Sequence, residues 1–552
     1  MKLTKITAMV AAIATAAGLG AVAASSASAE VQTTGDKTIT LNATSADQLT
    51  SHTFKAVKVA SYDVYGISPN QSVTLKTEDG LKQDIIDYLH YTGTGDPLAW
   101  AQQQNKAKLD QSTTSPWLGD GTTRGLADKL ASKATTDVMP TLSSDNKRAT
   151  FTLSSPGLWL IVDQAATGKS SKALPILAGT PLTINNKEYS SGFIDMKNQT
   201  ASVSKTVTDQ TVAAGQDASY KITTTVPNYV GYKVKGYQFT VSDKFADNAP
   251  LAYKAGTLTV KINGKTLTQG TDYTVTGFDL SSKTFTIDLS AYIKAKGFKG
   301  ILADDSKFTD AGLVGKTVTV EYKATVTGST GNNGAANTPT AKYPNDPSNN
   351  ESKQEVPGTP VKVFNFDYTL VKKDKTTGAA LEGAKFAIKN AAGNYLAYTR
   401  DQDGNNKWIN LDAKPAADAP SGVFTTGANG KVTFPALDEG KYTIEEIAAP
   451  TGYVNPGVSF SFTIAANLSG TGADQTASPT YTVDADGTGS DVWHLVGNGN
   501  TAEVVVENVK NITQLPLTGG AGTVLFTVVA ALLISAGVTI GVVKSHKAST
   551  IA

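Results

Sequence analysis

Three polar residues near the C-terminal end of the sequence share strand faces with hydrophobic residues. In Phe364–Lys372 every second residue is apolar until Lys372, so a strand with a period of two turns this lysine toward the core. The same parity turns Glu446 and Asn508 inward on their own strands. An amine, a carboxyl group and a carboxamide are thus predicted to face the interior of one module, where an isolated buried charge would be very costly.

The sequence around these positions resembles a Cna B-type domain. Lys372–Asp374, followed by Gly378 and Gly383–Phe386, is similar to the opening of such a domain. Tyr442–Tyr453 is similar to its E-box, with Ile447 where the family usually has threonine. Cna B-type domains form an intramolecular isopeptide bond, and the resemblance implies one here.

The resemblance implies that Lys372 is the nucleophile, Asn508 the acceptor and Glu446 the acid/base of this bond. Burial lowers the pKa of a lysine and leaves a neutral, nucleophilic amine. It raises the pKa of a glutamate, so the protonated acid can polarise the asparagine carboxamide. The amine attacks, ammonia leaves, and two charges become one neutral amide. The alternative is a buried Lys–Glu ion pair with no covalent bond.

A second lysine and a second acid show the same parity in the middle of the chain. Lys205 faces inward in Val203–Val207, and Asp243 faces inward in Phe239–Phe245. This part of the sequence is similar to the isopeptide-forming middle domain of fimbrial subunits, in which aspartate takes the role of glutamate. The resemblance implies that Lys205 is the nucleophile and Asp243 the acid/base. An ordinary Lys–Asp ion pair is the alternative.

The acceptor of this second bond should lie near the last strand of its module. We predict Asn337, which follows Gly334–Ala336. Asn332 and Asn333 compete for the role, and the sequence leaves them open.

The N-terminus has the features of a secretory signal peptide. Lys2 and Lys5 form a basic region before the apolar stretch Ile6–Ala24. Ala27–Ala29 fits an A-x-A cleavage site, so we expect cleavage before Glu30. The alternative is an uncleaved membrane anchor.

The C-terminus combines a short motif, an apolar stretch and a basic tail. Ala521–Val543 is long enough to span a bilayer as a helix, and Lys544 and Lys547 follow it. The motif before it consists of Leu515, Pro516, Leu517, Thr518 and Gly519. Together they resemble the cell-wall sorting signal of Gram-positive surface proteins, which sortases cut between threonine and glycine. The resemblance implies that the Thr518 carbonyl is passed to an amine; an ordinary single-pass anchor is the alternative.

One lysine is a candidate for that amine. Sortase-assembled pilins usually carry a lysine in a Tyr-Pro-Lys-Asn-like segment near the end of the first domain. Phe193–Gln199 stands at this place and keeps Lys-Asn, with Asp-Met in place of Tyr-Pro. We therefore predict Lys197 as the acceptor, the alternative being a solvated surface lysine. Lys342–Asn345 contains Tyr-Pro but has no lysine after it.

The expected fold class is mainly β. Tandem immunoglobulin-like (Cna A/B-type) β-sandwiches should follow an N-terminal α+β-decorated β domain. Three segments of the first domain have helical spacing of apolar residues: Gly80–Tyr91, Pro97–Leu109 and Thr123–Ala134. No helix is expected from about Ala201 to Gly358, and Asn345–Gly358 is predicted as a linker. The predicted boundaries are 1–29 for the signal peptide, 30–200 for the N-terminal domain, 201–358 for the middle sandwich, 359–513 for the C-terminal sandwich and 514–552 for the sorting signal, span and tail.

The composition excludes several kinds of chemistry. The 552 residues contain no cysteine, which rules out disulfides, thiolate metal sites and a cysteine nucleophile. The four histidines are scattered, and Asp401–Asn406 matches only part of a calcium loop, so we expect no metal and no cofactor. The 49 Lys+Arg and 48 Asp+Glu nearly cancel, which gives no reason to expect nucleic acid as a partner.

Taken together, the motifs resemble those of the backbone pilins of sortase-assembled fimbriae. The resemblance implies a secreted, wall-anchored structural subunit that is a substrate of sortase and not an enzyme, apart from forming its own isopeptide bonds. The implied partners are a class C-type pilin sortase, a housekeeping sortase with its peptidoglycan precursor, identical subunits, tip or base pilins and a host surface ligand. The alternative is a monomeric wall-anchored adhesin that binds host matrix or glycan through Glu30–Thr200; in the sequence, only Lys197 separates the two.

Overall fold

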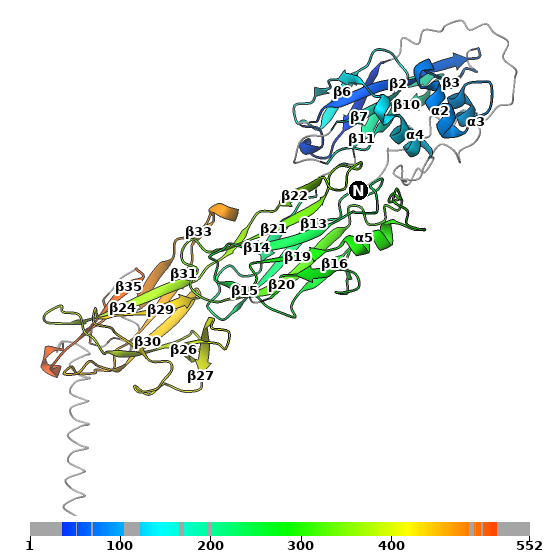
Figure 1. Ribbon diagram of the computed structural model, residues 1–552. Coiled ribbons are helices and arrows are strands. Elements are labelled where there is room, and N and C mark those ends of the chain that lie inside the picture. The colour runs from blue at the N-terminus through cyan, green and yellow to red at the C-terminus, as the bar shows by residue number, and fades with distance from the viewer. Residues whose placement is uncertain are drawn as a thin grey trace, which may run out of the picture.

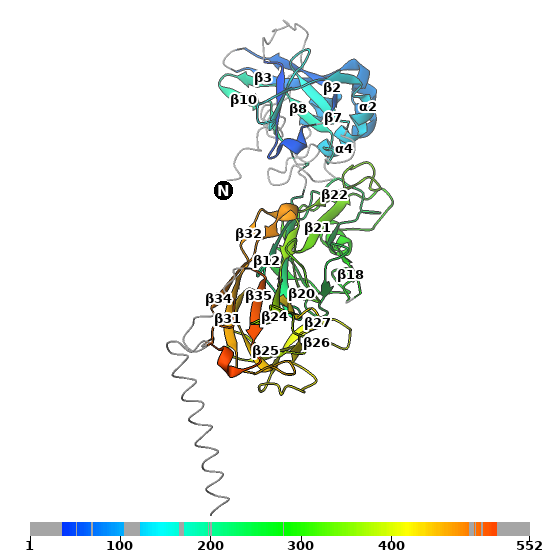
Figure 2. The same ribbon diagram turned by 90° about the vertical axis from the view of Figure 1, so that its left-hand side faces the viewer.

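The chain folds into three β-rich modules that follow one another along an elongated molecule (Figures 1 and 2). The structure is a computed structural model. It describes residues 36–515 except 51, 68–69, 104–121, 165–170, 197, 199–200, 280, 485–490, 492 and 498–500. Strands dominate every module and helices are few, so the predicted mainly β fold class is confirmed.

In its described residues, the first module packs two sheets and a small hairpin beside three helices. One sheet has the order β11-β1-β6-β5, the other β3-β2-β7-β8 with β4 on β2, and β9 pairs with β10. The strands are β1 (Thr38–Asn42), β2 (Phe54–Tyr65), β3 (Ser72–Thr77), β4 (Thr136–Val138), β5 (Thr141–Leu142), β6 (Arg148–Thr152), β7 (Leu158–Asp163), β8 (Ile176–Gly179), β9 (Leu182–Ile184), β10 (Lys187–Ser190) and β11 (Phe193–Asp195).

The helices of this module lie where the apolar spacing predicted them. They are α2 (Lys82–Leu89), α3 (Pro97–Gln103) and α4 (Thr122–Leu130), with short 3-10 turns η1 (Ala46–Gln48), η2 (Asp79–Leu81) and η3 (Ala131–Lys133). Helix α3 begins at Pro97, a residue suited to the first helical position. The Asp96 carboxylate before it accepts hydrogen bonds from the backbone nitrogens of Leu98 and Ala99, which caps the helix.

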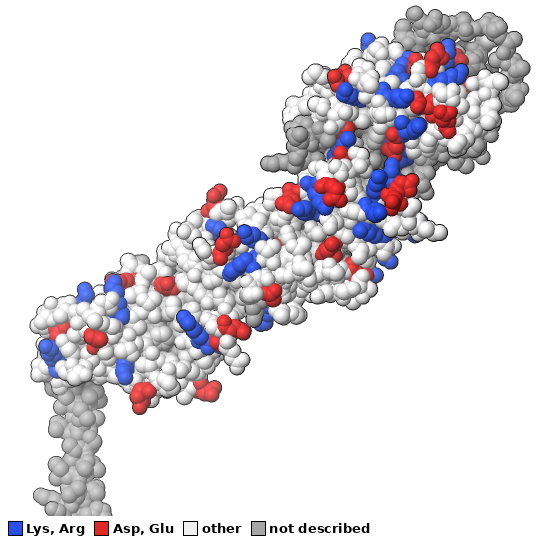
Figure 3. Space-filling model, viewed as in Figure 1, with Lys and Arg blue, Asp and Glu red and all other residues white. Residues whose placement is uncertain are grey.

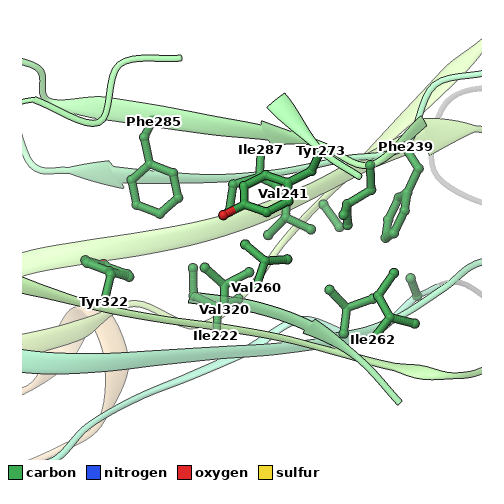
Figure 4. Packing of buried hydrophobic residues seen from close by; sticks show 14 of the residues in the cluster. Ile222, Phe239, Val241, Val260, Ile262, Tyr273, Phe285, Ile287, Val320 and Tyr322 are labelled. Carbon is green, nitrogen blue, oxygen red and sulfur yellow. The ribbon is translucent and has the colours of Figure 1, made fainter. Parts of the chain in front are cut away.

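The middle module is a sandwich of two sheets. Their orders are β12-β13-β20-β16-β17, with β15 on β20, and β18-β19-β14-β21-β22, with β23 on β21. The strands are β12 (Ser204–Val207), β13 (Asp217–Thr225), β14 (Thr240–Phe245), β15 (Leu251–Tyr253), β16 (Thr259–Ile262), β17 (Lys265–Thr266), β18 (Thr274–Thr276), β19 (Thr284–Asp288), β20 (Thr317–Val326), β21 (Ala335–Pro344), β22 (Lys353–Pro357) and β23 (Val361–Val363). Alternating residues of both sheets interdigitate as one buried core (Figure 4).

Two expectations for the middle module are wrong. A helix, α5 (Ser290–Gly297), follows β19, where no helix was expected. It has only eight residues, too few for a helical period to stand out, and it begins where the Asp288 carboxylate accepts a hydrogen bond from the Ser290 nitrogen at 2.8 Å. The predicted linker Asn345–Gly358 contains β22, which pairs with β21, because polar residues suit a strand at the exposed edge of a sheet.

The third module contains a three-stranded sheet, β29-β24-β35, and a larger sheet, β27-β26-β25-β30-β31-β34, with β28 on β25. The strands are β24 (Phe366–Asp374), β25 (Lys385–Lys389), β26 (Tyr395–Arg400), β27 (Asn406–Leu411), β28 (Phe424–Thr425), β29 (Lys431–Leu437), β30 (Gly440–Ala448), β31 (Ser459–Ala465), β32 (Leu468–Ser469), β33 (Thr476–Ala477), β34 (Thr480–Asp484) and β35 (Glu503–Asn508). Two 3-10 turns, η4 (Gly472–Asp474) and η5 (Ile512–Gln514), complete it.

The middle and third modules are joined by backbone hydrogen bonds. The Ala214 nitrogen donates to the Ala436 oxygen at 3.0 Å, and the Trp408 nitrogen donates to the Ala214 oxygen at 2.9 Å. Gly215 beside them has a φ of +88°, and a Cβ there would stand 2.3 Å from the Cβ of Lys407, so only glycine fits this close approach.

The junction between the first and middle modules is more polar. Lys307 contacts Asp128 across it at 2.7 Å, and the Lys172 nitrogen donates to the Asn345 oxygen at 2.7 Å. Acidic and basic side chains are interspersed on the face drawn in Figure 3 and gather around this junction. This pattern agrees with the near-zero net charge and shows no extended patch of one sign on that face.

None of the helices in the described part of the chain is long and apolar enough to cross a membrane. The predicted signal peptide before Glu30 and the predicted span Ala521–Val543 both lie outside that part.

Candidate intramolecular bond sites

In the third module, two neighbouring strands and the facing sheet supply the three predicted residues. Lys372 lies on β24, and Asn508 lies on β35, which runs parallel beside it. Glu446 comes from β30 in the opposite sheet. The Lys372 Nζ lies 3.3 Å from Glu446 Oε2, and the Asn508 Nδ2 donates to Glu446 Oε1 at 2.9 Å. One carboxyl group therefore contacts both the amine and the carboxamide.

This site is buried, and burial shifts the pKa values of its lysine and its acid toward the neutral forms. Lys372 and Asn508 have no exposed surface, and Glu446 is 4% exposed. Burial lowers the pKa of Lys372 to about 8, against the opposing charge of Glu446. Burial likewise raises the pKa of Glu446, although Lys372 and the Asn508 amide oppose the rise. The Asn508 Oδ1 is buried with no hydrogen-bond partner, so it is open to polarisation by a protonated acid.

In the middle module the same three kinds of group meet, but from different strands. Lys205 lies on β12 of one sheet, whereas Asp243 on β14 and Asn337 on β21 belong to neighbouring strands of the other sheet. The Lys205 Nζ contacts Asp243 Oδ1 at 2.5 Å, and neither side chain is exposed. Asn337 is also fully buried, with its Oδ1 unpartnered.

A fourth residue, Tyr322 on β20, lies at the centre of this middle site. Its hydroxyl oxygen accepts hydrogen bonds from Lys205 Nζ and from Asn337 Nδ2, each at 2.7 Å. The hydroxyl donates to Asp243 Oδ2. Tyr322 was missed in the sequence because it continues the inward alternation of β20 and looks like one more core aromatic residue. Its only signal was a hydroxyl among aliphatic neighbours.

Aromatic rings complete the surroundings of the middle lysine. The Lys205 Nζ lies 4.7 Å from the centre of the Tyr220 ring and 5.2 Å from that of Tyr322. Burial lowers the pKa of Lys205 to about 8, although Asp243 opposes the shift. Burial, aided by the charge of Asp243, raises the pKa of Tyr322 well above its ordinary range.

The structure separates the three candidate acceptors of the middle module. Asn337 faces Phe245 across β21 and β14 and points into the site. Asn332 and Asn333 are exposed in the turn before β21. Among the three asparagines, only Asn337 is therefore brought to the lysine and the acid.

The predicted residues for joining subunits fall largely outside the described part of the chain. Lys197 and Pro516–Gly519 are outside it, whereas Leu515 is buried at the end of the third module. Both neighbours of Lys197 are described: Met196 is buried, and the buried Asn198 donates from Nδ2 to the Ser171 oxygen at 2.8 Å.

The competing segment Lys342–Asn345 lies at the end of β21 and in the residue after it. There Lys342 contacts Glu355 at 2.7 Å across the strand pair, as an exposed ion pair. In the described residues, no group of three or more histidine, aspartate or glutamate side chains is arranged to hold a metal ion. The Asp401 carboxylate accepts hydrogen bonds from the backbone nitrogens of Asp403 and Asn405, which is the geometry of a turn.

Two protein families match parts of this chain. The SpaA family, described as a prealbumin-like fold domain, matches residues 366–476, which include Lys372 and Glu446. The LPXTG cell wall anchor motif matches residues 507–549, which include Asn508. The chain carries a prealbumin-like domain and a cell wall anchor. The predicted resemblance and the cell wall location are thereby confirmed.

Solved structures of several pilins are similar to this wall-anchored chain. The T6 backbone pilin of serotype M6 Streptococcus pyogenes is 15% identical, covering 86% of this chain and 98% of its own, with a TM-score of 0.46. The full-length major pilin SpaD from Corynebacterium diphtheriae is 16% identical over 86% and 97%, with a TM-score of 0.42. The full-length major pilin RrgB from Streptococcus pneumoniae is 15% identical over 67% and 87%, with a TM-score of 0.40. No sequence among the curated proteins matches significantly.

Proposed function

We propose that this chain is the shaft subunit of a covalently polymerised pilus, stabilised by two intramolecular Lys–Asn isopeptide bonds. The observation that carries the proposal is the repeated triad: two modules of different sheet topology each bury a lysine paired with an acid, and an asparagine held beside the pair. Glu446 contacts this asparagine directly in the third module, and Tyr322 bridges to it in the middle module. Each module buries the charges of a lysine and an acid, and this costs free energy unless the charges are removed. An isopeptide bond removes them.

The same reaction would run in both modules. The lysine ammonium gives a proton to the paired carboxylate, which leaves a neutral amine and a neutral acid. The amine nitrogen attacks the asparagine Cγ, a new C–N bond forms, the old C–N bond breaks, and ammonia leaves. The lowered lysine pKa in both modules supports this step, because it reduces the cost of deprotonating the amine. The carboxamide oxygens of Asn337 and Asn508 are buried without a hydrogen-bond partner, so a proton donated to them by the neutral acid would polarise the carboxamide.

Subunits would be joined by a second kind of amide. A class C-type pilin sortase breaks the peptide bond between Thr518 and Gly519, and the Thr518 carbonyl is transferred to Lys197 of an identical subunit. A housekeeping sortase would transfer the last subunit to a peptidoglycan precursor. The wall anchor match supports this proposal. The protein itself acts on no other substrate.

Immunoblots of cell wall extracts test the polymer. We expect a ladder of high-molecular-weight species from the wild type and its loss in Lys197→Ala. The matched control is Lys342→Ala, which removes an exposed lysine of the competing segment and should keep the ladder. A ladder that persists in Lys197→Ala would refute the assignment of that lysine. A wild type without any ladder would instead favour the monomeric adhesin.

A further inference from the structure

The two candidate bond sites differ in what contacts the acceptor amide. In the third module, Glu446 reaches the Asn508 Nδ2 directly at 2.9 Å. In the middle module the acid is an aspartate, one methylene shorter, and the Asn337 Nδ2 donates to the Tyr322 hydroxyl at 2.7 Å. The tyrosine oxygen thus occupies the position that the longer acid fills in the other module.

The Tyr322 hydroxyl touches both nitrogens that would take part in the reaction. It accepts a hydrogen bond from the Lys205 Nζ at 2.7 Å, the same distance as from Asn337. Its own proton points at Asp243. Figure 4 shows that Tyr322 lies at one end of the buried core between the two sheets, near Phe285, and the two ring centres are 5.1 Å apart. This packing fixes the ring and hence the oxygen.

We propose that Tyr322 is a catalytic residue in the formation of the middle-module bond. Its hydroxyl passes a proton from the attacking Lys205 nitrogen to the leaving Asn337 nitrogen. The inference rests on the proposed isopeptide function. It adds a fourth participant that the third module does not need, because there one carboxyl group contacts both partners.

The relay keeps atoms and charge in balance. Lys205 first gives one proton to Asp243, and its neutral nitrogen attacks the Asn337 Cγ. The attacking nitrogen then carries one proton too many, while the old amide nitrogen needs one to leave as ammonia. The Tyr322 oxygen takes the first proton as its own proton moves to the leaving nitrogen. The products are the new amide, ammonia and a protonated Asp243, with Tyr322 unchanged.

The surroundings of Tyr322 suit a neutral relay. The ring is 2% exposed, so water does not compete for the proton. Burial and the Asp243 charge raise the pKa of the Tyr322 hydroxyl, so it stays protonated at neutral pH until both transfers occur together. Once Asp243 has taken the lysine proton, its carboxyl group accepts less strongly, and the hydroxyl is free to turn toward Asn337.

The neighbouring tyrosines have different contacts. The Tyr220 ring packs against Lys205, and its hydroxyl lies beside the Asn337 side chain. The Tyr253 hydroxyl donates to the backbone oxygen of Asp243 at 3.0 Å. Tyr253→Phe is therefore the matched control for Tyr322→Phe, since it also removes a buried hydroxyl beside Asp243, but one that hydrogen-bonds backbone oxygens.

The test measures bond formation in the full chain after a pulse of synthesis. Proteolytic peptides that contain Lys205 joined to Asn337 are quantified by mass spectrometry at intervals. We expect bond formation to slow by roughly 100-fold in Tyr322→Phe, the usual effect of losing an acid–base group, and to stay unchanged in Tyr253→Phe. The third-module peptide joining Lys372 to Asn508 should form normally in every variant and reports that the chain has folded.

A double variant separates catalysis from packing. In Tyr322→Phe with Asp243→Glu, the longer acid can reach Asn337 as Glu446 reaches Asn508, so bond formation should recover. A structural role of the tyrosine would not be rescued in this way. Normal bond formation in Tyr322→Phe, or a folded double variant that does not recover, would overturn the relay. A wild type with no joined peptide in either module would instead overturn the proposed isopeptide function.

Discussion

The middle and third modules bring the same functional groups together from opposite arrangements of strands. In the third module the lysine and asparagine sit on parallel neighbours of one sheet, and the acid comes from the facing sheet. In the middle module the acid and asparagine sit on antiparallel neighbours, and the lysine comes from the facing sheet. A Lys372–Asn508 bond would therefore clamp two strands of one sheet, whereas a Lys205–Asn337 bond would clamp two sheets.

This difference shows that the chemistry depends on contact and dryness more than on strand order. Both lysines have a pKa lowered to about 8 by burial, and both asparagines have a buried carbonyl oxygen without a partner. The acids differ by one methylene, and the middle module compensates with a tyrosine hydroxyl. The following experiments use one module as the reference for the other.

The largest effect should come from removing an acceptor. Asn508→Ala and Asn337→Ala should each destabilise their own module by about 5 kcal/mol. Each bond closes a loop of roughly 130–140 residues, and a cross-link across a loop of that length lowers the conformational entropy of the unfolded chain by about this much. Calorimetry would show one transition shifted to lower temperature and the others unchanged. Asn410→Ala, an exposed asparagine on β27, is the control. Equal unfolding curves for wild type and acceptor variants would contradict the cross-links.

The acids give the next test. Glu446→Gln should prevent the third-module bond, and Asp243→Asn the middle one, because a carboxamide cannot take the lysine proton. The intact mass should rise by about 17 Da relative to the fully bonded chain, one ammonia for each missing bond, apart from the mass of the substitution itself. The other module serves as the internal control. If the mass of a variant is still lower by one ammonia for each of the two bonds, the substituted acid is not needed for bond formation.

The titration of Lys372 should be visible only when the bond is absent. Its folded pKa of about 8 lies below the ordinary lysine value, so the unfolded chain binds more protons between about pH 8 and 10.5, and stability should rise with pH in that window. We expect a gain of about 1–3 kcal/mol for Asn508→Ala in denaturant titrations. The bonded wild type has no amine to titrate at this position and should show no such rise, which makes it the control.

The smallest effect concerns the asparagines that the structure leaves outside the middle site. Asn332→Ala and Asn333→Ala should keep the loss of one ammonia for each bond, apart from the mass of the substitution itself. Each should alter stability by less than about 0.5 kcal/mol, since both residues are exposed in a turn. Loss of the bond in either variant, measured by intact mass, would reassign the acceptor.

Strand alternation was sufficient to predict which side chains turn inward. Lys205, Asp243, Lys372, Glu446 and Asn508 are all buried, as their parity with neighbouring hydrophobic residues indicated. Parity does not reveal which sheet a strand joins, because strand pairing depends on contacts between distant parts of the chain. The opposite arrangements of the two modules were therefore invisible in the sequence.

Tyr322 and α5 show two further limits. A tyrosine at a core position of β20 has the same pattern as any aromatic residue, and only the nearby Lys205 and Asn337 give its hydroxyl a role. Helix α5 is a single short segment whose start depends on a local contact between Asp288 and Ser290. Periodicity therefore placed Tyr322 in the core without revealing its role, and it gave no sign of the short helix α5.

The positions of the two clamps along the chain also bear on how the protein would respond to pulling. Lys205 lies on the first strand of the middle module and Asn337 on one of its last, and Lys372 and Asn508 hold the corresponding places in the third. An amide between such positions transmits a pulling force directly from the first strand to the last. The roughly 130 residues between them then bear no tension, whereas without the amide each could extend by ~3.3–3.6 Å. About 430 Å of chain per module would remain folded behind one covalent link. A fibre of such subunits would be nearly inextensible, and stretching it would strain bonds before it unravelled sheets.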